Sequence, residues 1–108
     1  MKLISAFMLT FFASLSTASA ADGKFTIKYL GHASFLIVSP GGIRIVTDPF
    51  DPSVGYPWKK VTADVITVSH EHYDHNYVKA IDGNPKVIRG LKNGGREWNA
   101  VKVRIGDV

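Results

Sequence analysis

The chain has 108 residues, of which 45% are hydrophobic and 20% are charged, and this balance excludes a disordered or collagen-like protein. The formal net charge is +4, but the lysines and arginines are scattered without a run or stripe, so we expect no nucleic-acid partner. Cysteine is absent, which excludes disulfides, cysteine-ligated zinc and thiol catalysis. Any metal ion must therefore be held by histidines and carboxylates.

The first 20 residues have the pattern of a secretory signal peptide. Lys2 is followed by an apolar stretch at 3–15 and by a small-residue tail at 16–20 that contains A-x-A. A membrane-spanning helix needs about 20 consecutive apolar residues, and this stretch is shorter and is interrupted by Ser5 and Thr10, so we expect no stable membrane anchor. Cleavage near Ala20 would place one modest domain, 21–108, in the periplasm or the medium.

Apolar patterns predict a three-stranded meander at the start of this domain. Residues 24–30 alternate apolar and polar side chains, as in a strand with one buried face. Short apolar runs at 34–38 and 43–47 predict two more strands, and the turn residues at 39–42 separate them. The segment 48–58 contains three prolines and a glycine, which predicts a loop, and loops of this kind often line functional sites.

A further strand is predicted at 65–68, where β-branched residues indicate burial on both faces and a central place in a sheet. After it, Asn76 can cap a short helix over 77–81 that Asp82-Gly83-Asn84-Pro85 ends. The remaining predictions are strands at 86–89 and 101–105 on either side of a glycine-containing turn at 91–95.

Three of the four histidines lie in one window, H-E-H-Y-D-H at 70–75, directly after the predicted buried strand. His70 and His72 are two residues apart, so both imidazoles can turn to one side of an extended backbone and bind one cation. Asp74 and His75 follow where the chain bends and can serve a second cation. Two cations ~3.5–4 Å apart can share a hydroxide and polarise an ester, lactone or phosphate oxygen.

The alternative interpretation of this window is a solvated polar loop or a chance chelator of transition metals. The window, however, follows a buried strand and precedes a helix cap, and rigid elements of that kind hold metal ligands in place. The ligand types and their context therefore favour a metal site. Glu71 and Tyr73 occupy the intervening positions and are expected to point away from it; the alternative for Tyr73 is that it reaches the substrate.

Three motifs in order carry a family resemblance. They are G-H-A-S-F-L-I at 31–37, T-D-P-F at 47–50 and A-D-V-I-T-V-S-H-E-H-Y-D-H-N at 63–76. Together they resemble the metallo-β-lactamase superfamily, specifically its branch similar to the ascorbate-6-phosphate lactonases, over residues 24–108. The resemblance implies an α/β (α+β) fold, a four-layer αββα sandwich with the site at one edge between its two sheets.

The resemblance also implies site residues. His70 and His72 would ligate a first zinc ion, and Asp74 and His75 a second, although manganese and iron suit the same ligands. Asp48 matches a family position close to the metals and is expected to accept a hydrogen bond from a ligating imidazole, fixing its tautomer; the alternative is a turn aspartate.

Three residues near the expected site have less defined roles. His32 either approaches the site from the end of the first strand or packs under the loop as a turn histidine. Tyr56 and Trp58 are expected to pack the loop rather than to contact substrate.

The sequence departs from the superfamily after His75. Members supply a third histidine for the first metal, a bridging aspartate and a further histidine from regions C-terminal to the H-x-H-x-D-H loop. This sequence has no histidine after His75, and the acidic residues that follow it are Asp82, Glu97 and Asp107. We therefore expect 21–108 to be the N-terminal part of the domain, apparently truncated, and by itself inactive and marginally folded.

These observations lead to one main functional hypothesis. The complete protein is expected to be an exported metal-dependent hydrolase in which a metal-bound hydroxide attacks an ester, lactone or phosphodiester bond of a small-molecule substrate. The alternatives are a truncated, non-catalytic fragment and a metal-binding module, for which the histidines of the 70–75 window would suffice.

Overall fold

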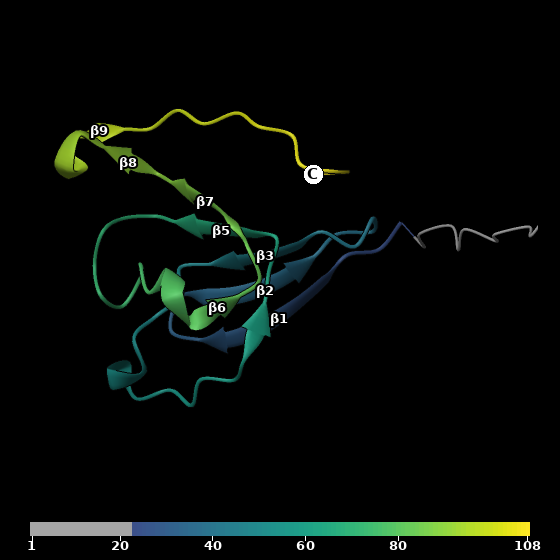
Figure 1. The fold of residues 1–108 in the computed structure, drawn as a ribbon, viewed down its shortest axis with the longest axis horizontal. Helices are drawn as coiled ribbons and strands as arrows, with labels where there is room; N and C mark the ends of the chain where they lie inside the picture. The colour runs from purple at the N-terminus through teal and green to yellow at the C-terminus, as the bar shows by residue number, and fades with distance from the viewer. Residues whose placement is uncertain (1–22) are drawn as a thin grey trace, which may run out of the picture.

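The computed structural model describes residues 23–108, so the predicted signal peptide lies outside the described residues. A five-stranded mixed sheet forms the centre of the molecule, with strand order β1-β2-β3-β5-β7 (Figure 1). The strands span Thr26–Gly31 (β1), Ser34–Val38 (β2), Arg44–Thr47 (β3), Val65–Val68 (β5) and Lys86–Arg89 (β7).

The pairing of the strands confirms the predicted meander and the inner position of the strand at 65–68. β1 and β2 pair antiparallel, as do β2 and β3, whereas β5 lies between β3 and β7 and is parallel to both. Because Thr47 pairs with Thr67, the carboxyl ends of β3 and β5 meet at one edge of the sheet. The antiparallel pairing of β2 with β3 brings the β1–β2 turn to the same edge.

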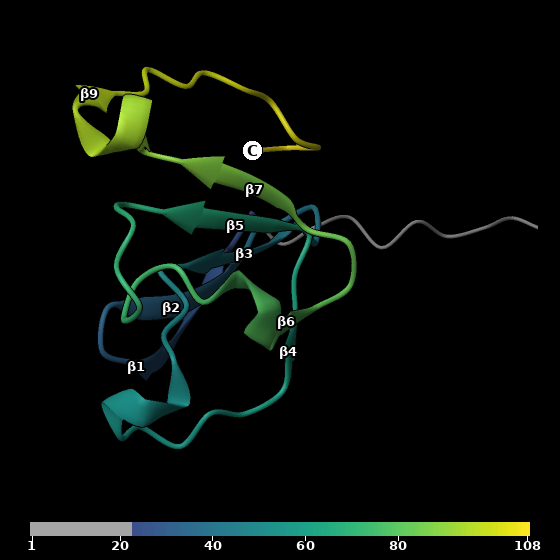
Figure 2. The same cartoon turned by 60° about the vertical axis from the view of Figure 1, so that its left-hand side comes forward.

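The core lies between one face of the sheet and a thin second layer. This layer contains the parallel pair β4 (Val61–Thr62) and β6 (Ile81–Asp82), which Figure 2 shows off the plane of the main sheet. The buried cluster consists of Val46, Val61, Ala63, Ile66, Val68 and Ile81. Ile66 and Val68 are almost fully buried, and such burial stabilises the fold by about 1.5–3 kcal/mol per side chain.

The predicted loop at 48–58 is confirmed and contains one 3-10 turn, η1 (Pro52–Val54). The predicted helix at 77–81 is instead the 3-10 turn η2 (Val78–Ala80), because Ile81 leaves it to pair with Val61. Asn76 does not cap this turn, since its side-chain amide donates to Glu71. None of the helical turns within residues 23–108 has the length and apolar character that a membrane crossing requires.

Two further predictions were wrong. Phe25, Ile27 and Tyr29 are 55–62% exposed instead of buried, because β1 is the edge strand and its apolar side chains face away from the core cluster. Residues 101–105 do not form a strand. Within the described residues, the backbone hydrogen bonds of Ile105 are to Val108, in a terminal turn, and not to a neighbouring strand.

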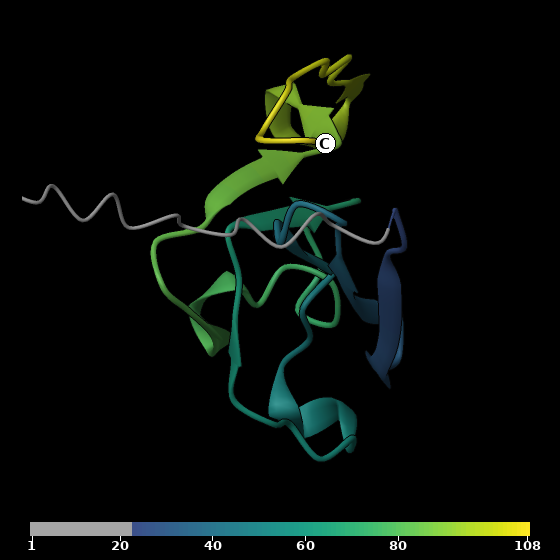
Figure 3. The ribbon, with the colours of Figure 1, turned by 90° about the vertical axis from the view of Figure 1, so that its right-hand side faces the viewer.

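The C-terminal segment instead follows the opposite face of the main sheet. The short hairpin of β8 (Leu91–Lys92) and β9 (Glu97–Trp98), which encloses the turn η3 (Asn93–Gly95), reverses the chain, and Figure 3 shows the following residues on the β7 side of the molecule. Val103, Ile105 and Val108 line a small cavity together with sheet residues that include Ile45 and Ile88. The segment is held to the sheet by these apolar contacts and by Asp107, which accepts from the Ser39 hydroxyl at 2.6 Å and from the Gly41 N–H group at 2.7 Å.

Candidate metal centre

The candidate site is built by three segments that meet at the carboxyl edge of β3 and β5. The β1–β2 turn supplies His32, the residue after β3 is Asp48, and the loop after β5 contains the 70–75 window. Two hydrogen bonds fix this arrangement: the Ser34 hydroxyl donates to the Thr47 carbonyl at 2.8 Å, and the Asp48 N–H donates to the Thr67 carbonyl at 2.8 Å. Residues far apart in sequence are thus placed side by side.

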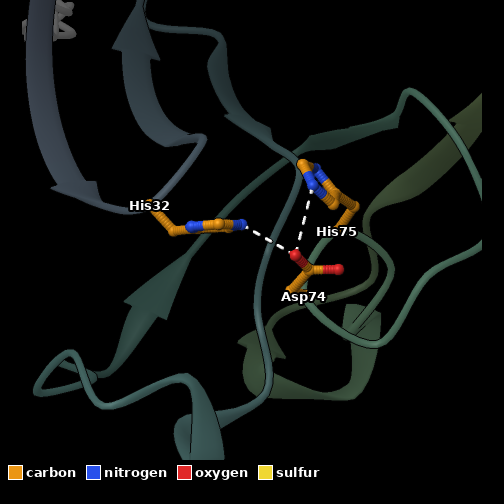
Figure 4. A group of neighbouring side chains, drawn as sticks. All are labelled: His32, Asp74 and His75. Carbon is orange, nitrogen blue, oxygen red and sulfur yellow. Dashed lines mark hydrogen bonds and ion pairs between the residues drawn. The ribbon is translucent and has the colours of Figure 1, made fainter.

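His32, Asp74 and His75 form the tightest group of possible ligands (Figure 4). One donor atom from each residue lies within 4.8 Å of the other two, and all three residues are half-buried. The Asp74 Oδ2 atom lies 2.9 Å from the His32 Nε2 atom and 3.5 Å from the His75 Nε2 atom. Two imidazole nitrogens and a carboxylate oxygen that converge in this way fit a divalent transition metal such as zinc.

The second carboxylate oxygen of Asp74 contacts His72. The Oδ1 atom lies 2.6 Å from the His72 Nδ1 atom. Hydrogen bonding to His72, and then to His32, lowers the pKa of Asp74 from its ordinary 3.8 to about 2. Asp74 is therefore ionised near neutral pH, which is the form that binds a cation.

Asp48 holds the imidazole of His75 in one tautomer. Its Oδ2 atom lies 3.0 Å from the His75 Nδ1 atom, and an ionised carboxylate can only accept, so the Nδ1–H group of His75 is the donor. The His75 Nε2 atom is then the unprotonated nitrogen and is directed to the same side as Asp74 (Figure 4). This is the arrangement in which a neutral histidine ligates a metal.

Ser69 connects Asp48 to His70 and so fixes the tautomer of His70 as well. The Ser69 N–H and hydroxyl groups both donate to Asp48, each at 2.6 Å. Because its only hydroxyl proton is used in this way, Ser69 Oγ must accept from the His70 Nδ1 atom, which lies 2.9 Å away. His70 is thereby left with its Nε2 atom free for a metal. One carboxylate thus sets the tautomers of two histidines.

All six residues that the sequence analysis selected lie in one cluster. The ring of His70 lies 4.2 Å from that of His75 and 6.0 Å from that of His72, measured between ring centroids. The cluster joins the four expected metal ligands to Asp48 and His32, and comprises His32, Asp48, His70, His72, Asp74 and His75. His32 lies in the β1–β2 turn, and its Nε2 atom is placed where it could serve as a ligand.

The two residues between the expected ligands, Glu71 and Tyr73, make contacts of their own. The Glu71 carboxylate accepts from the Asn76 amide at 2.9 Å and pairs with the Arg89 guanidinium. These hydrogen bonds, the one to Asn76 first, lower the pKa of Glu71. Tyr73 is 59% exposed. Glu71 is thus engaged outside the cluster, whereas the Tyr73 ring lies beside that of His72, 5.4 Å away between centroids.

Tyr56 and Trp58 pack the loop, as predicted. Both rings contact the fully buried Phe50, at 5.7 and 4.8 Å between centroids, and the Trp58 indole N–H donates to the Ala80 carbonyl at 3.3 Å.

Sequence reasoning missed Ser69 and Arg89. Ser69 carries one usable signal, a hydroxyl residue between a buried strand and a histidine. Arg89 carries none, because only the parallel pairing of β5 with β7 brings it next to Glu71.

Comparison with known proteins identifies the family. Residues 26–108 match the family described as the beta-lactamase superfamily domain. The chain belongs to this family. The match confirms the resemblance to the metallo-β-lactamase superfamily, and the mixed sheet with few helical turns agrees with the predicted fold class, the N-terminal part of an αββα sandwich.

Several relatives carry the description "UPF0173 metal-dependent hydrolase". One from Anaeromyxobacter sp. (strain K) is 41% identical over 61 residues, which cover 52% of this chain and 22% of the relative. One from Rubrobacter xylanophilus is 44% identical over 57 residues, which cover 49% of this chain and 24% of the relative. The chain thus matches less than a quarter of the length of these relatives.

A similar solved structure comes from Thermotoga maritima and belongs to the metallo-beta-lactamase superfamily. It is 40% identical to this chain, with a TM-score of 0.49, and the alignment covers 66% of this chain and 34% of the other.

Proposed function

We propose that this chain forms the N-terminal, metal-binding part of an exported metal-dependent hydrolase. The observation that carries the proposal is the convergence of His32, Asp74 and His75 within 4.8 Å, beside the imidazoles of His70 and His72. Membership of the beta-lactamase superfamily and relatives described as metal-dependent hydrolases support the same function.

The residues of the cluster divide into two groups of ligands. His70 and His72 would hold one ion, and Asp74 and His75 a second, with His32 added to the second group because of its distance to Asp74. Imidazole and carboxylate donors without cysteine favour zinc, and they also suit manganese and iron. When bound, such a cation supplies a Lewis acid and makes a coordinated water molecule nucleophilic near neutral pH.

The chain's own groups would prepare the site for this chemistry. Asp48 keeps the Nε2 atoms of His70 and His75 unprotonated, one through Ser69 and the other directly. Asp74 supplies the negative charge that offsets part of the charge of a dication. A site of this kind is suited to polarising the ester, lactone or phosphodiester oxygen of a small substrate, and we propose these classes, in the manner of the lactonase-like branch, as its substrates.

Elemental analysis of the purified full chain tests the metal site. The His70→Ala, His72→Ala double variant should lose the first ion, and with it about half of the zinc that the wild-type protein retains, because both imidazoles of that group are removed while the second group is intact. Tyr73→Phe is the matched control, since it alters the same turn outside the cluster and should keep the metal content. An unchanged zinc content in the double variant would refute the ligand assignment.

Export is tested by intact mass. If the leader is removed, protein recovered from the periplasm or the medium should begin at Ala21. Recovery of only the full-length species from the cytosol would contradict export and leave the metal site unaffected.

A further inference from the structure

A groove next to the metal cluster has the properties of a substrate-binding site. It lies between β1 and the loop that follows η1, has a volume of about 210 Å³, and is lined mainly by apolar surface. A cavity of about 150 Å³ is large enough for benzene, so this groove can take one aromatic ring or a short acyl chain. Its lining includes Lys28, Tyr29, Gly31, Tyr56, Trp58 and Lys59.

The groove borders the candidate metal centre. Tyr56 forms part of its wall, and the ring of Tyr56 lies 6.4 Å from the ring of His32, measured between centroids. Gly31, which also lines the groove, is the residue before His32. A molecule that lies along Tyr56 can therefore place a reacting bond beside His32 and Asp74.

The wall of the groove is held rigidly by packing. A Cβ atom on Gly31 would lie 2.8 Å from the Tyr56 ring, so the ring rests directly on the glycine backbone. Trp58 is fixed from behind, by its edge contact with Phe50 and its hydrogen bond to Ala80. The groove is thus formed before any ligand binds, which lowers the entropic cost of binding.

The charges at the groove are both positive. Lys28 and Lys59 line it, and no aspartate or glutamate does. The ion pairs found within residues 23–108 involve neither lysine. An apolar floor with two lysines not engaged in such pairs is complementary to a molecule that has an apolar body and an anionic group.

We propose that this groove binds the non-reacting part of the substrate, and that the substrate is an ester, lactone or phosphodiester with a short apolar or aromatic body and an anionic group. The proposal rests on the proposed function for the identity of the bond that is cleaved. The apolar body lies on Tyr56 and Trp58, and the anionic group is held by Lys28 and Lys59.

Binding of hexyl phosphate to the full chain, with metal removed by a chelator, tests the proposal without any catalytic step. The background variant is Trp98→Phe, which leaves Trp58 as the single tryptophan, so its emission reports on the groove. We expect a saturable shift in Trp58 emission with hexyl phosphate. Hexanol, which has no charge, and inorganic phosphate, which has no apolar body, should each bind at least about tenfold more weakly.

Charge variants then locate the anionic group. Lys28→Gln with Lys59→Gln should weaken hexyl phosphate binding about tenfold. Lys86→Gln with Lys102→Gln removes the same net charge outside the groove and should change the affinity by less than about twofold. The proposal is overturned if hexyl phosphate gives no saturable shift, if hexanol or phosphate alone binds as well, or if the two double variants lose affinity equally.

The same measurement separates this proposal from the proposed function. In the His70→Ala, His72→Ala variant, hexyl phosphate should bind as it does to the parent, because the groove does not contain these residues. If the parent protein binds metal normally but does not bind hexyl phosphate in the groove, only the proposed substrate class is overturned. If the His70→Ala, His72→Ala variant binds hexyl phosphate normally and also keeps its full metal content, only the metal assignment is overturned.

Discussion

The imidazole of His32 lies 2.9 Å from the carboxylate of Asp74, although the two residues are 42 positions apart in the sequence. The contact depends on an uncommon backbone conformation, since His32 has φ of +50°, in the region that residues other than glycine rarely adopt. The Tyr29 hydroxyl donates to the His32 carbonyl at 3.0 Å and helps to hold the turn. The turn thus aims the imidazole of His32 at an acidic residue, which is the geometry behind its proposed role as a ligand.

Replacement of His32 should weaken metal binding. In His32→Ala, Asp74 loses one of its two imidazole partners and the cluster loses a donor atom, so we expect zinc affinity to fall by about 10–100-fold. Competition with a chromophoric chelator measures this on the full chain. Tyr73→Phe serves as the control, and an affinity equal to that of the wild-type protein would show that His32 only fills the turn.

Asp48→Asn should weaken metal binding by a different route. The amide cannot accept at both positions, so its NH₂ group faces either the Ser69 N–H group or both the Ser69 hydroxyl and the His75 Nδ1–H group. We expect a loss of about 10–100-fold in zinc affinity. Nitrogen NMR shifts of the histidines should show mixed tautomers in the metal-free variant. Retention of single Nδ1–H tautomers with normal affinity would contradict the assigned role.

Much of the site follows from local sequence signals. The 70–75 window comes directly after a run of β-branched residues, and that run does form the inner strand β5, with Ile66 fully buried. The turn chemistry at 39–42 separates β2 from β3 as expected, and this pairing brings the T-D-P motif to the same edge of the sheet. Patterns of this kind depend on neighbours in the chain, which are visible in the sequence.

The errors arise where distant partners decide the outcome. Alternation at 24–30 predicts a strand correctly, but only the sheet order shows that β1 lies at the edge and that Ile27 is exposed. The valines at 101–105 have the same alternation and form no strand, because no described strand pairs with them. The contact between His32 and Asp74 cannot be predicted from the local sequence either, because it depends on the conformation of the β1–β2 turn and on the pairing of three strands.

Gly31→Ala should destabilise the protein and displace Tyr56. Gly31 has φ of +123°, and an added Cβ atom would meet the Tyr56 ring at 2.8 Å. Gly55→Ala is a matched control, because Gly55 also has a positive φ, +101°, but its Cβ atom would have no neighbour within 4 Å. In both variants the backbone strain should lower the free energy of unfolding by roughly 1–2 kcal/mol.

The difference between the two glycine variants isolates the contact with Tyr56. We expect Gly31→Ala to lower the free energy of unfolding by about 1–3 kcal/mol more than Gly55→Ala does, as measured by denaturant titration. Adding Tyr56→Ala to Gly31→Ala should remove much of this excess. An equal cost for the two single variants would show that the Tyr56 ring moves aside freely.

Asp64 should make the fold sensitive to acid independently of any metal. It joins the starts of three strands: its side chain accepts from the Arg44 N–H group and guanidinium at 2.8–3.1 Å, and its carbonyl accepts from the Lys86 N–H group at 2.9 Å. These hydrogen bonds from Arg44 lower the pKa of Asp64 from 3.8 to about 2. Because the folded-state pKa lies below the unfolded value, the stabilisation is present above about pH 4 and disappears as the pH falls towards 2.

Thermal unfolding of Asp64→Asn at several pH values tests this dependence. The wild-type protein should melt at a higher temperature than the variant between pH 5 and 7, by a constant difference, because the carboxylate is ionised in both the folded and the unfolded chain over that range. The difference should shrink between pH 4 and 2, as the wild-type carboxylate becomes protonated and the pair with Arg44 is lost. Glu97→Gln, on the exposed β8–β9 hairpin, is the control for removal of one negative charge. A difference that stays constant down to pH 2 would mean that the ionised form of Asp64, and therefore its ion pair with Arg44, contributes nothing to stability.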